Sequence, residues 1–122
     1  MTNLGPFNTD ADIASDLIPF LINQMKTRYD VNARTIDMYN SAIYPFERRI
    51  AFRYELSGSD FHFMRETSDG RWAEKKGSNK SNSTVFSLGL TPEDNIWDAK
   101  YTSSTFYFAI NNNGGNFDYA AF

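Results

Sequence analysis

The residues best suited to chemistry gather in one stretch, DFHFMRETSDGRWAEKKG, at positions 60–77. It holds the chain's one histidine, His62, and two glutamates, Glu66 and Glu74. A histidine and a glutamate can move protons while nearby cations hold a phosphate, which is the chemistry of a metal-independent ribonuclease. One hypothesis is therefore a small RNase-type toxin that uses His62 with Glu66 or Glu74. The cations that would serve it are Arg65, Arg71, Lys75 and Lys76.

The same stretch also has a structural interpretation. On a strand, His62 lies on the face opposite Phe61 and Phe63, so it is exposed if both phenylalanines belong to the core. Opposite charges that pair across strands would account for the glutamates and cations as well. The net charge of −3 argues against a nucleic-acid partner, because such a partner needs a basic face. A lone histidine is a weak catalytic signal, and the sequence favours a chain that is not an enzyme.

Other catalytic and metal-binding patterns are missing from the sequence. There is no cysteine, which excludes thiol nucleophiles, zinc–thiolate sites and disulfides. No calcium-loop, HExxH or paired-histidine spacing appears. The start of the chain, MTNLGPFNTD, lacks the basic and apolar regions of a signal peptide, and Pro19 interrupts the longest apolar run. We therefore predict no metal, no cofactor, no membrane partner and a cytoplasmic location.

The aromatic content offers a second kind of functional signal. The chain has 11 Phe, 7 Tyr and 2 Trp in 122 residues, so a single core has many rings to hold. Tyrosine and tryptophan are enriched as anchors at protein interfaces. A core simply built from aromatic residues is the alternative interpretation, and the sequence leaves both open. The candidate anchors are Tyr39, Tyr44, Tyr101, Tyr107 and Trp97.

One helix and several strands must position these residues. Residues 10–29 have helical spacing of apolar side chains after an N-cap at Thr9 or Asp10, and Pro19 predicts either a kink or a break into two helices. Residues 30–46 are ambiguous between a short helix and an irregular strand. Alternation predicts strands near 47–56, 61–67, 71–76, 85–90 and 104–110, with a last hairpin strand at 116–122 and a helix start at 91–94. We predict one α+β domain over residues 1–122, with the N-terminal helix packed on a mostly antiparallel sheet of about five strands.

Part of the chain resembles an uncharacterised bacterial family with the segment H-[FWY]-[YM]-R-x-x-S-D-G-x-W-S-H-K-x-G. Residues 62–65 and 68–72 match this segment, and Lys75 and Gly77 fall in step. Further matches follow at 91–94, 101–102 and 107–108, so the resemblance covers about residues 60–110. The family looks like papain-like Cys/His hydrolases, which implies a helix packed on an antiparallel sheet. The catalytic cysteine is absent here, and Glu74 stands where the family has a histidine, so the resemblance implies a catalytically silent relative.

Three classes of function remain open. The first is a non-catalytic interaction or inhibitor protein, built like phage-encoded inhibitors of host defence (anti-CRISPR-like) or toxin-immunity proteins. The second is the RNase-type toxin, and the third is a phage or oligomeric accessory protein whose C-terminal hairpin pairs edge to edge with another copy. We favour the first class, with another protein as partner. Its predicted contacts are the polar residues His62, Arg65, Arg71 and Glu74 and the anchors Trp97 and Tyr101.

Overall fold

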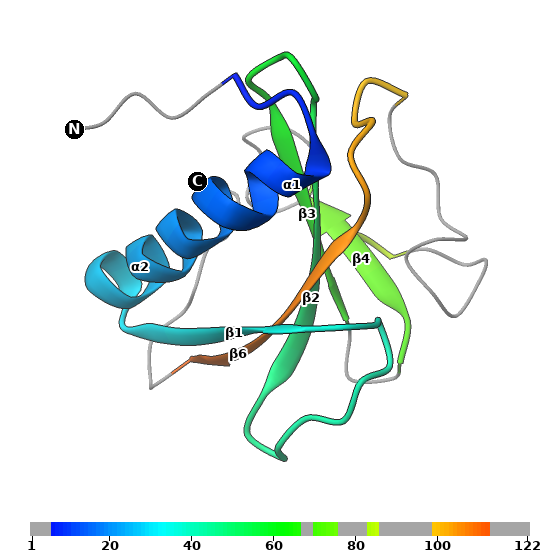
Figure 1. Cartoon of the computed structure of the whole chain (residues 1–122). Coiled ribbons are helices and arrows are strands. Elements are labelled where there is room, and N and C mark those ends of the chain that lie inside the picture. Colours follow the sequence, from blue (N-terminus) through cyan, green and yellow to red (C-terminus); the bar gives the residue numbers. More distant parts are fainter. Residues whose placement is uncertain (1–5, 67–69, 76–82, 86–98, 113–122) are drawn as a thin grey trace.

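A helical segment near the N-terminus packs against one face of an antiparallel sheet (Figure 1). The computed structural model describes residues 6–66, 70–75, 83–85 and 99–112. The helical segment contains α1 (Asp10–Asp12), the π-helical turn η1 (Ile13–Leu17) and α2 (Ile18–Tyr29). The strands are β1 (Val31–Ile36), β2 (Arg48–Tyr54), β3 (Phe61–Glu66), β4 (Trp72–Lys75), β5 (Ser83–Val85) and β6 (Phe106–Asn112).

The predicted α+β class is confirmed. The sheet has six strands in the order β1-β6-β2-β3-β4-β5, where about five were predicted, and each neighbouring pair is antiparallel. The alternating stretches that predicted strands at 47–56, 61–67 and 71–76 correspond to β2, β3 and β4. The predicted helix start at 91–94 and the last strand at 116–122 lie outside the described residues.

The helical segment begins at a capping threonine and changes geometry just before its proline. The Oγ1 of Thr9 accepts a hydrogen bond from the Asp12 amide at 3.1 Å. The Ile18 amide then donates to the Ile13 carbonyl, which is the five-residue step of a π turn. Pro19 follows as the second residue of α2, directly after this π turn.

The two faces of the sheet carry different cores. Alternation along β2 places Ile50 and Phe52 on the helix side and Ala51 on the other side. The helix-side cluster is large and joins the helical segment to β1, β2, β3 and β6. The cluster on the second face is small and centres on Trp72, which is fully buried and whose indole N–H has no hydrogen-bond partner among the described residues. The other members of this second cluster are Ala51, Met64 and Tyr107, with Ile36 and Tyr39 packed against them.

The ambiguous region at 30–46 resolves into a strand and a loop. Residues 31–36 form β1, which pairs with β6 far along the chain. Both β1 and β2 run antiparallel to β6, so they are parallel to each other. The loop at 37–47 must therefore return along the sheet from the end of β1 to the start of β2, because parallel strands need such a crossover. Figure 1 shows this loop at the end of the sheet away from the start of α1.

Candidate binding site

The β1–β2 loop, residues 37–47, exposes a group of large apolar side chains. Met38 is 55% exposed, Tyr44 59% and Phe46 61%, and these are the only large hydrophobic residues classed as exposed in the part of the chain that the structure describes. Apolar residues scattered singly over a surface are ordinary, whereas a concentration in one segment marks an interaction site. We call Met38, Tyr44 and Phe46 the loop patch.

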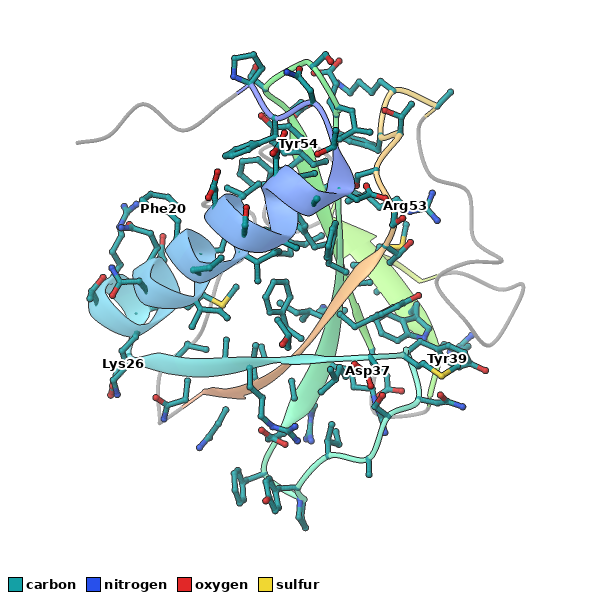
Figure 2. The ribbon with its side chains drawn as sticks, viewed as in Figure 1. Phe20, Lys26, Asp37, Tyr39, Arg53 and Tyr54 are labelled. Carbon is teal, nitrogen blue, oxygen red and sulfur yellow. The ribbon has the colours of Figure 1, made fainter. Side chains whose placement is uncertain are left out.

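Inward-facing residues attach the start of the loop to the sheet. Ile36 and Tyr39 pack on the second core cluster, beside Trp72. Figure 2 shows Asp37 and Tyr39 where the chain leaves β1. The burial of Tyr39 and the exposure of Met38 next to it follow from this attachment, because neighbouring side chains point in different directions along an extended chain.

A bidentate ion pair between Arg34 and Glu47 closes the loop. Arg34 Nε donates to Glu47 Oε2 at 3.0 Å, and Arg34 Nη2 donates to Glu47 Oε1 at 2.8 Å. The same Oε1 accepts a hydrogen bond from the Tyr44 amide at 2.9 Å. The Glu47 side chain is only 6% exposed. The bond from Arg34 lowers the pKa of the Glu47 carboxyl, and burial opposes this change.

A second arginine holds the middle of the loop. Arg49 Nη2 and Nε donate to the Ser41 carbonyl at 2.7 and 3.0 Å. Arg49 Nη1 donates to both oxygens of Glu66 on β3, at 3.0 and 3.2 Å. The Ser41 hydroxyl in turn accepts a bond from the Met38 amide at 2.9 Å. Strands β2 and β3 therefore hold the backbone that carries the loop patch.

The aromatic part of the loop patch is ordered by stacking. The Tyr44 and Phe46 rings have centroids 5.5 Å apart and are nearly parallel, at 8°. The guanidinium carbon of Arg34 lies 5.5 Å from the Tyr44 centroid, within the range of a cation–π contact. Arg34 therefore supports the loop patch twice, through Glu47 and through Tyr44. The two stacked rings remain largely exposed to solvent.

Two of the six residues predicted from the sequence come together elsewhere, near the β2–β3 turn. The rings of His62 and Tyr101 stack with centroids 5.7 Å apart at 19°. The Tyr101 hydroxyl donates to Asp60 Oδ2 at 3.0 Å, and Lys100 Nζ donates to the same oxygen at 2.6 Å. The bond from Lys100 lowers the pKa of Asp60. Asp60 Oδ2 therefore accepts hydrogen bonds from both Tyr101 and Lys100 within the protein.

The other predicted residues take different places relative to this pair, and only Glu74 has a register position on the same face of the sheet as His62, diagonally across the β3–β4 pair. Arg65 pairs in register with Ile50, so it lies on the helix side of the sheet, opposite to His62. Arg71 is exposed next to β4, and Glu74 faces Met64 across the β3–β4 pair. Trp97 lies outside the described residues.

Glu66, one of the two carboxylates proposed for a ribonuclease site, is engaged elsewhere. Glu66 forms the ion pair with Arg49, four residues along β3 from His62. Four residues of strand span about 13 Å, which is too far for a histidine and a carboxylate to act on one group. No described feature brings the two side chains together.

The loop patch is the feature that sequence reasoning largely missed. Tyr44 is among the tyrosines that the sequence marks as anchors, but Met38 and Phe46 are not marked. The signal that could have found them is the Tyr-Pro-Phe run at 44–46, since a proline between two aromatics disfavours a regular element. The supporting pairs of Arg34 with Glu47 and of Arg49 with Glu66 join residues 13 and 17 positions apart, and no local pattern announces them.

Comparisons with known proteins add no relative. A scan against protein-family models finds no match, and neither do searches of curated proteins and of solved structures. The resemblance to papain-like hydrolases therefore stays a prediction.

Within the described ranges, no group of three or more His, Cys, Asp or Glu residues could hold a metal ion. No helix among those residues is long and apolar enough to cross a membrane.

Proposed function

We propose that this protein is a non-catalytic protein-binding domain whose partner docks on the loop patch. One observation carries the proposal: the exposed large hydrophobic residues of the described structure all lie in a single loop, at Met38, Tyr44 and Phe46. Methionine, tyrosine, phenylalanine and arginine are the residue types enriched at protein interfaces. The loop patch combines three of these types with the neighbouring Arg34.

The internal support of the loop makes it suited to binding. Ordering a loop and its side chains on association costs free energy and weakens binding. Here the Arg34–Glu47 pair and the bonds from Arg49 to Ser41 already hold the backbone. The Tyr44–Phe46 stack restricts both rings before a partner arrives. The loop is therefore already ordered before binding, so contact with the aromatic rings can contribute to affinity without the free-energy cost of ordering them.

A domain of this kind can act as an inhibitor by covering the active site or binding site of its partner. The two inhibitory forms are a phage-encoded inhibitor of host defence, similar in build to anti-CRISPR proteins, and an immunity protein for a bacterial toxin. The small acidic chain with net charge −3 and the absence of any cysteine nucleophile support the inhibitory form. In both forms the loop patch is the contact surface, so one set of variants tests both.

The test compares partner binding by the native chain and by a Tyr44→Ser/Phe46→Ser double variant. We expect the native chain to retain a discrete protein from a lysate of the source cells. The purified partner should then bind the double variant at least about 10-fold more weakly by calorimetry, as for removal of interface anchors. Asn23→Ser, on the exposed surface of α2, is the matched control and should bind like the native chain. Equal binding of the double variant would refute the proposal.

A further inference from the structure

We propose that the outer edge of strand β1 (Val31–Ile36) binds an extended segment of a partner protein, which adds to the sheet as a further strand. This inference goes beyond the proposed function, because the edge of β1 is a different surface from the loop patch. The strand order β1-β6-β2-β3-β4-β5 leaves β1 and β5 at the two edges of the sheet. An edge strand presents a row of backbone N–H and C=O groups, and an extended peptide is the occupant that pairs with such a row.

Of the two edges, β1 is the one long enough to pair with another strand. β5 has three residues, Ser83–Val85, and a very short edge strand is one way in which proteins prevent pairing. β1 has six residues, and each of them pairs with one residue of β6 in an unbroken register. The strand contains no bulge and no proline, so its outer edge is regular over its whole length.

The outward-facing backbone groups of β1 have no partner within the described structure. β1 forms its ladder with β6, and no hydrogen bond joins the backbone of residues 31–36 to any other described element. On the face toward the helix, Val31 is buried, Ala33 is half-buried and Thr35 is exposed. Figure 1 shows the helical segment rising away from the later part of β1. The helix therefore covers only the first half of the strand and leaves space beside the second half.

The charge in the middle of β1 does not prevent pairing. Charged side chains, lysine above all, keep many natural edge strands from pairing with other chains. Arg34 is the one charged residue of β1, and its guanidinium donates two hydrogen bonds to the Glu47 carboxylate. Its charge is therefore offset within the protein, and an added strand does not have to neutralise it.

Two carboxylates at the ends of β1 indicate the charge of the added strand. Asp30 precedes the strand and Asp37 follows it, and both side chains are exposed. Asp30 contacts Lys26 in an exposed pair, which is worth little, and Asp37 forms no ion pair with another described residue. A segment with a lysine or arginine near each end places an opposite charge beside both aspartates. We therefore expect the partner segment to be extended and to carry basic residues at its ends.

The same carboxylates disfavour a second copy of this chain as the occupant. Two β1 strands that pair antiparallel along their whole length bring Asp30 of each copy close to Asp37 of the other. Two parallel copies bring the same ends together, so aspartates again meet at both ends. Like charges beside each other across a strand pair are destabilising, and each copy also carries a net charge of −3.

The experiment measures binding of a fluorescein-labelled synthetic peptide, Lys-Thr-Val-Thr-Val-Thr-Val-Lys, to the native chain by fluorescence anisotropy. The two lysines stand seven positions apart, as Asp30 and Asp37 do. We expect a dissociation constant on the order of 100 μM, together with slower amide hydrogen exchange at residues 31–36. No binding at about 1 mM peptide, or slower exchange only outside β1, would overturn the inference.

Two matched peptides test the backbone and the charges separately. The same peptide with its six central amides N-methylated cannot donate the ladder hydrogen bonds, so it should not bind. A peptide with glutamates in place of the lysines should bind about 10-fold more weakly at low salt. Asp37→Lys should remove most of this preference, whereas Asp16→Lys, the same charge change at an exposed position of η1, should keep it. Equal binding of the N-methylated peptide, or a preference that Asp37→Lys leaves unchanged, would contradict the proposal.

The loop patch supplies the control that separates this inference from the proposed function. The Tyr44→Ser/Phe46→Ser variant should bind the lysine peptide like the native chain, and loss of this binding would place the peptide on the loop patch and overturn the inference. If the native chain does not bind the peptide but loses a protein partner through this double variant, the edge inference fails and the proposed function stands. A native chain that dimerises with protection of the β1 amides would show a second copy on the edge and would also refute the inference.

Discussion

At the scale of single residues, two arginines turn an irregular loop into a defined surface. Arg34 bonds Glu47, which in turn accepts a hydrogen bond from the Tyr44 amide of the loop. Arg49 bonds Glu66 and also donates directly to the Ser41 carbonyl of the loop. An exposed ion pair contributes little to stability, but Glu47 is buried and also accepts a backbone N–H. Removing such an acceptor costs free energy, because the Tyr44 amide and the Arg34 guanidinium lose a charged partner.

We predict that Glu47→Ala lowers the free energy of unfolding by about 1–3 kcal/mol, because the Tyr44 amide and the Arg34 guanidinium lose their shared acceptor. Urea unfolding measures this change. Asp16→Ala, at an exposed position of η1, is the control and should stay within about 0.5 kcal/mol of the native chain. A Glu47→Ala chain as stable as this control would show that the pair does not support the fold.

The same carboxylates predict how stability depends on pH. Arg34 lowers the pKa of Glu47, and Lys100 lowers the pKa of Asp60. A carboxyl with a lowered folded-state pKa contributes stability above its unfolded pKa, near pH 4, and this stability is lost as the pH falls through the folded pKa. The urea midpoint, measured from about pH 7 to about pH 3, should therefore fall less in a Glu47→Gln/Asp60→Asn variant than in the native chain. Parallel curves for the two chains would disprove this linkage.

At the scale of elements, the C-terminal end of α2 sets the direction in which β1 leaves the helix. Asp30 has a left-handed backbone with φ of 55°, and its amide donates to the carbonyls of Met25 and Lys26. This geometry ends the helix in one residue, so that β1 begins at Val31 and folds back under α2. The loop patch depends on this reversal, because β1 leads directly into the loop that carries it.

We predict that Asp30→Gly raises the free energy of unfolding by about 0.5–1 kcal/mol, since glycine adopts the left-handed region without the steric cost of a Cβ. The lost contact between Lys26 and Asp30 is exposed and worth little. Asp30→Val should be destabilising, because a β-branched residue is the least tolerated there. Thermal unfolding of both variants checks the order, and a more stable valine variant would refute the argument.

At the scale of the whole molecule, hydrogen bonds tie together three distant segments at the end opposite the loop patch. The lead-in at 6–9, the β2–β3 turn at 55–60 and the segment at 99–105 meet there, as Figure 1 shows. Ser57 donates its amide to the Phe7 carbonyl, and Ser104 donates to Asp10. One end of the protein is thus an internally bonded junction, and the other carries the exposed aromatic surface.

Buried Ser103 is central to this junction, and we predict that Ser103→Ala lowers the free energy of unfolding by about 1–3 kcal/mol. Its hydroxyl accepts the Tyr54 amide at 2.9 Å and donates to the Ser104 carbonyl at 2.8 Å. Chemical denaturation gives the loss, with the exposed Asn23→Ser as control. Partner binding at the loop patch should be unchanged, since the two ends share no side chain. Loss of binding without loss of stability would contradict this separation.

Local patterns alone determined much of this protein. The period of two in residues 48–54 and 61–66 predicts β2 and β3, and Thr9 with the helical spacing after it predicts the start of the helical segment. These features depend on neighbouring residues, so they can be read from the chain directly. The α+β class follows from their order.

Tertiary structure alone decided where β1 lies and which aromatics reach solvent. Residues 31–36 become a strand because β6, more than 70 residues later in the chain, supplies their hydrogen-bond partners. Tyr44 lies in a loop and is exposed, whereas Tyr54 on β2 and Tyr107 on β6 are buried by the elements that pack against these strands. Exposure is set by what packs against a side chain from other elements, and the arginine pairs that hold the loop patch join residues from different strands. For this reason the sequence predicted a site around His62, whereas the fold indicates a candidate site at residues 37–47.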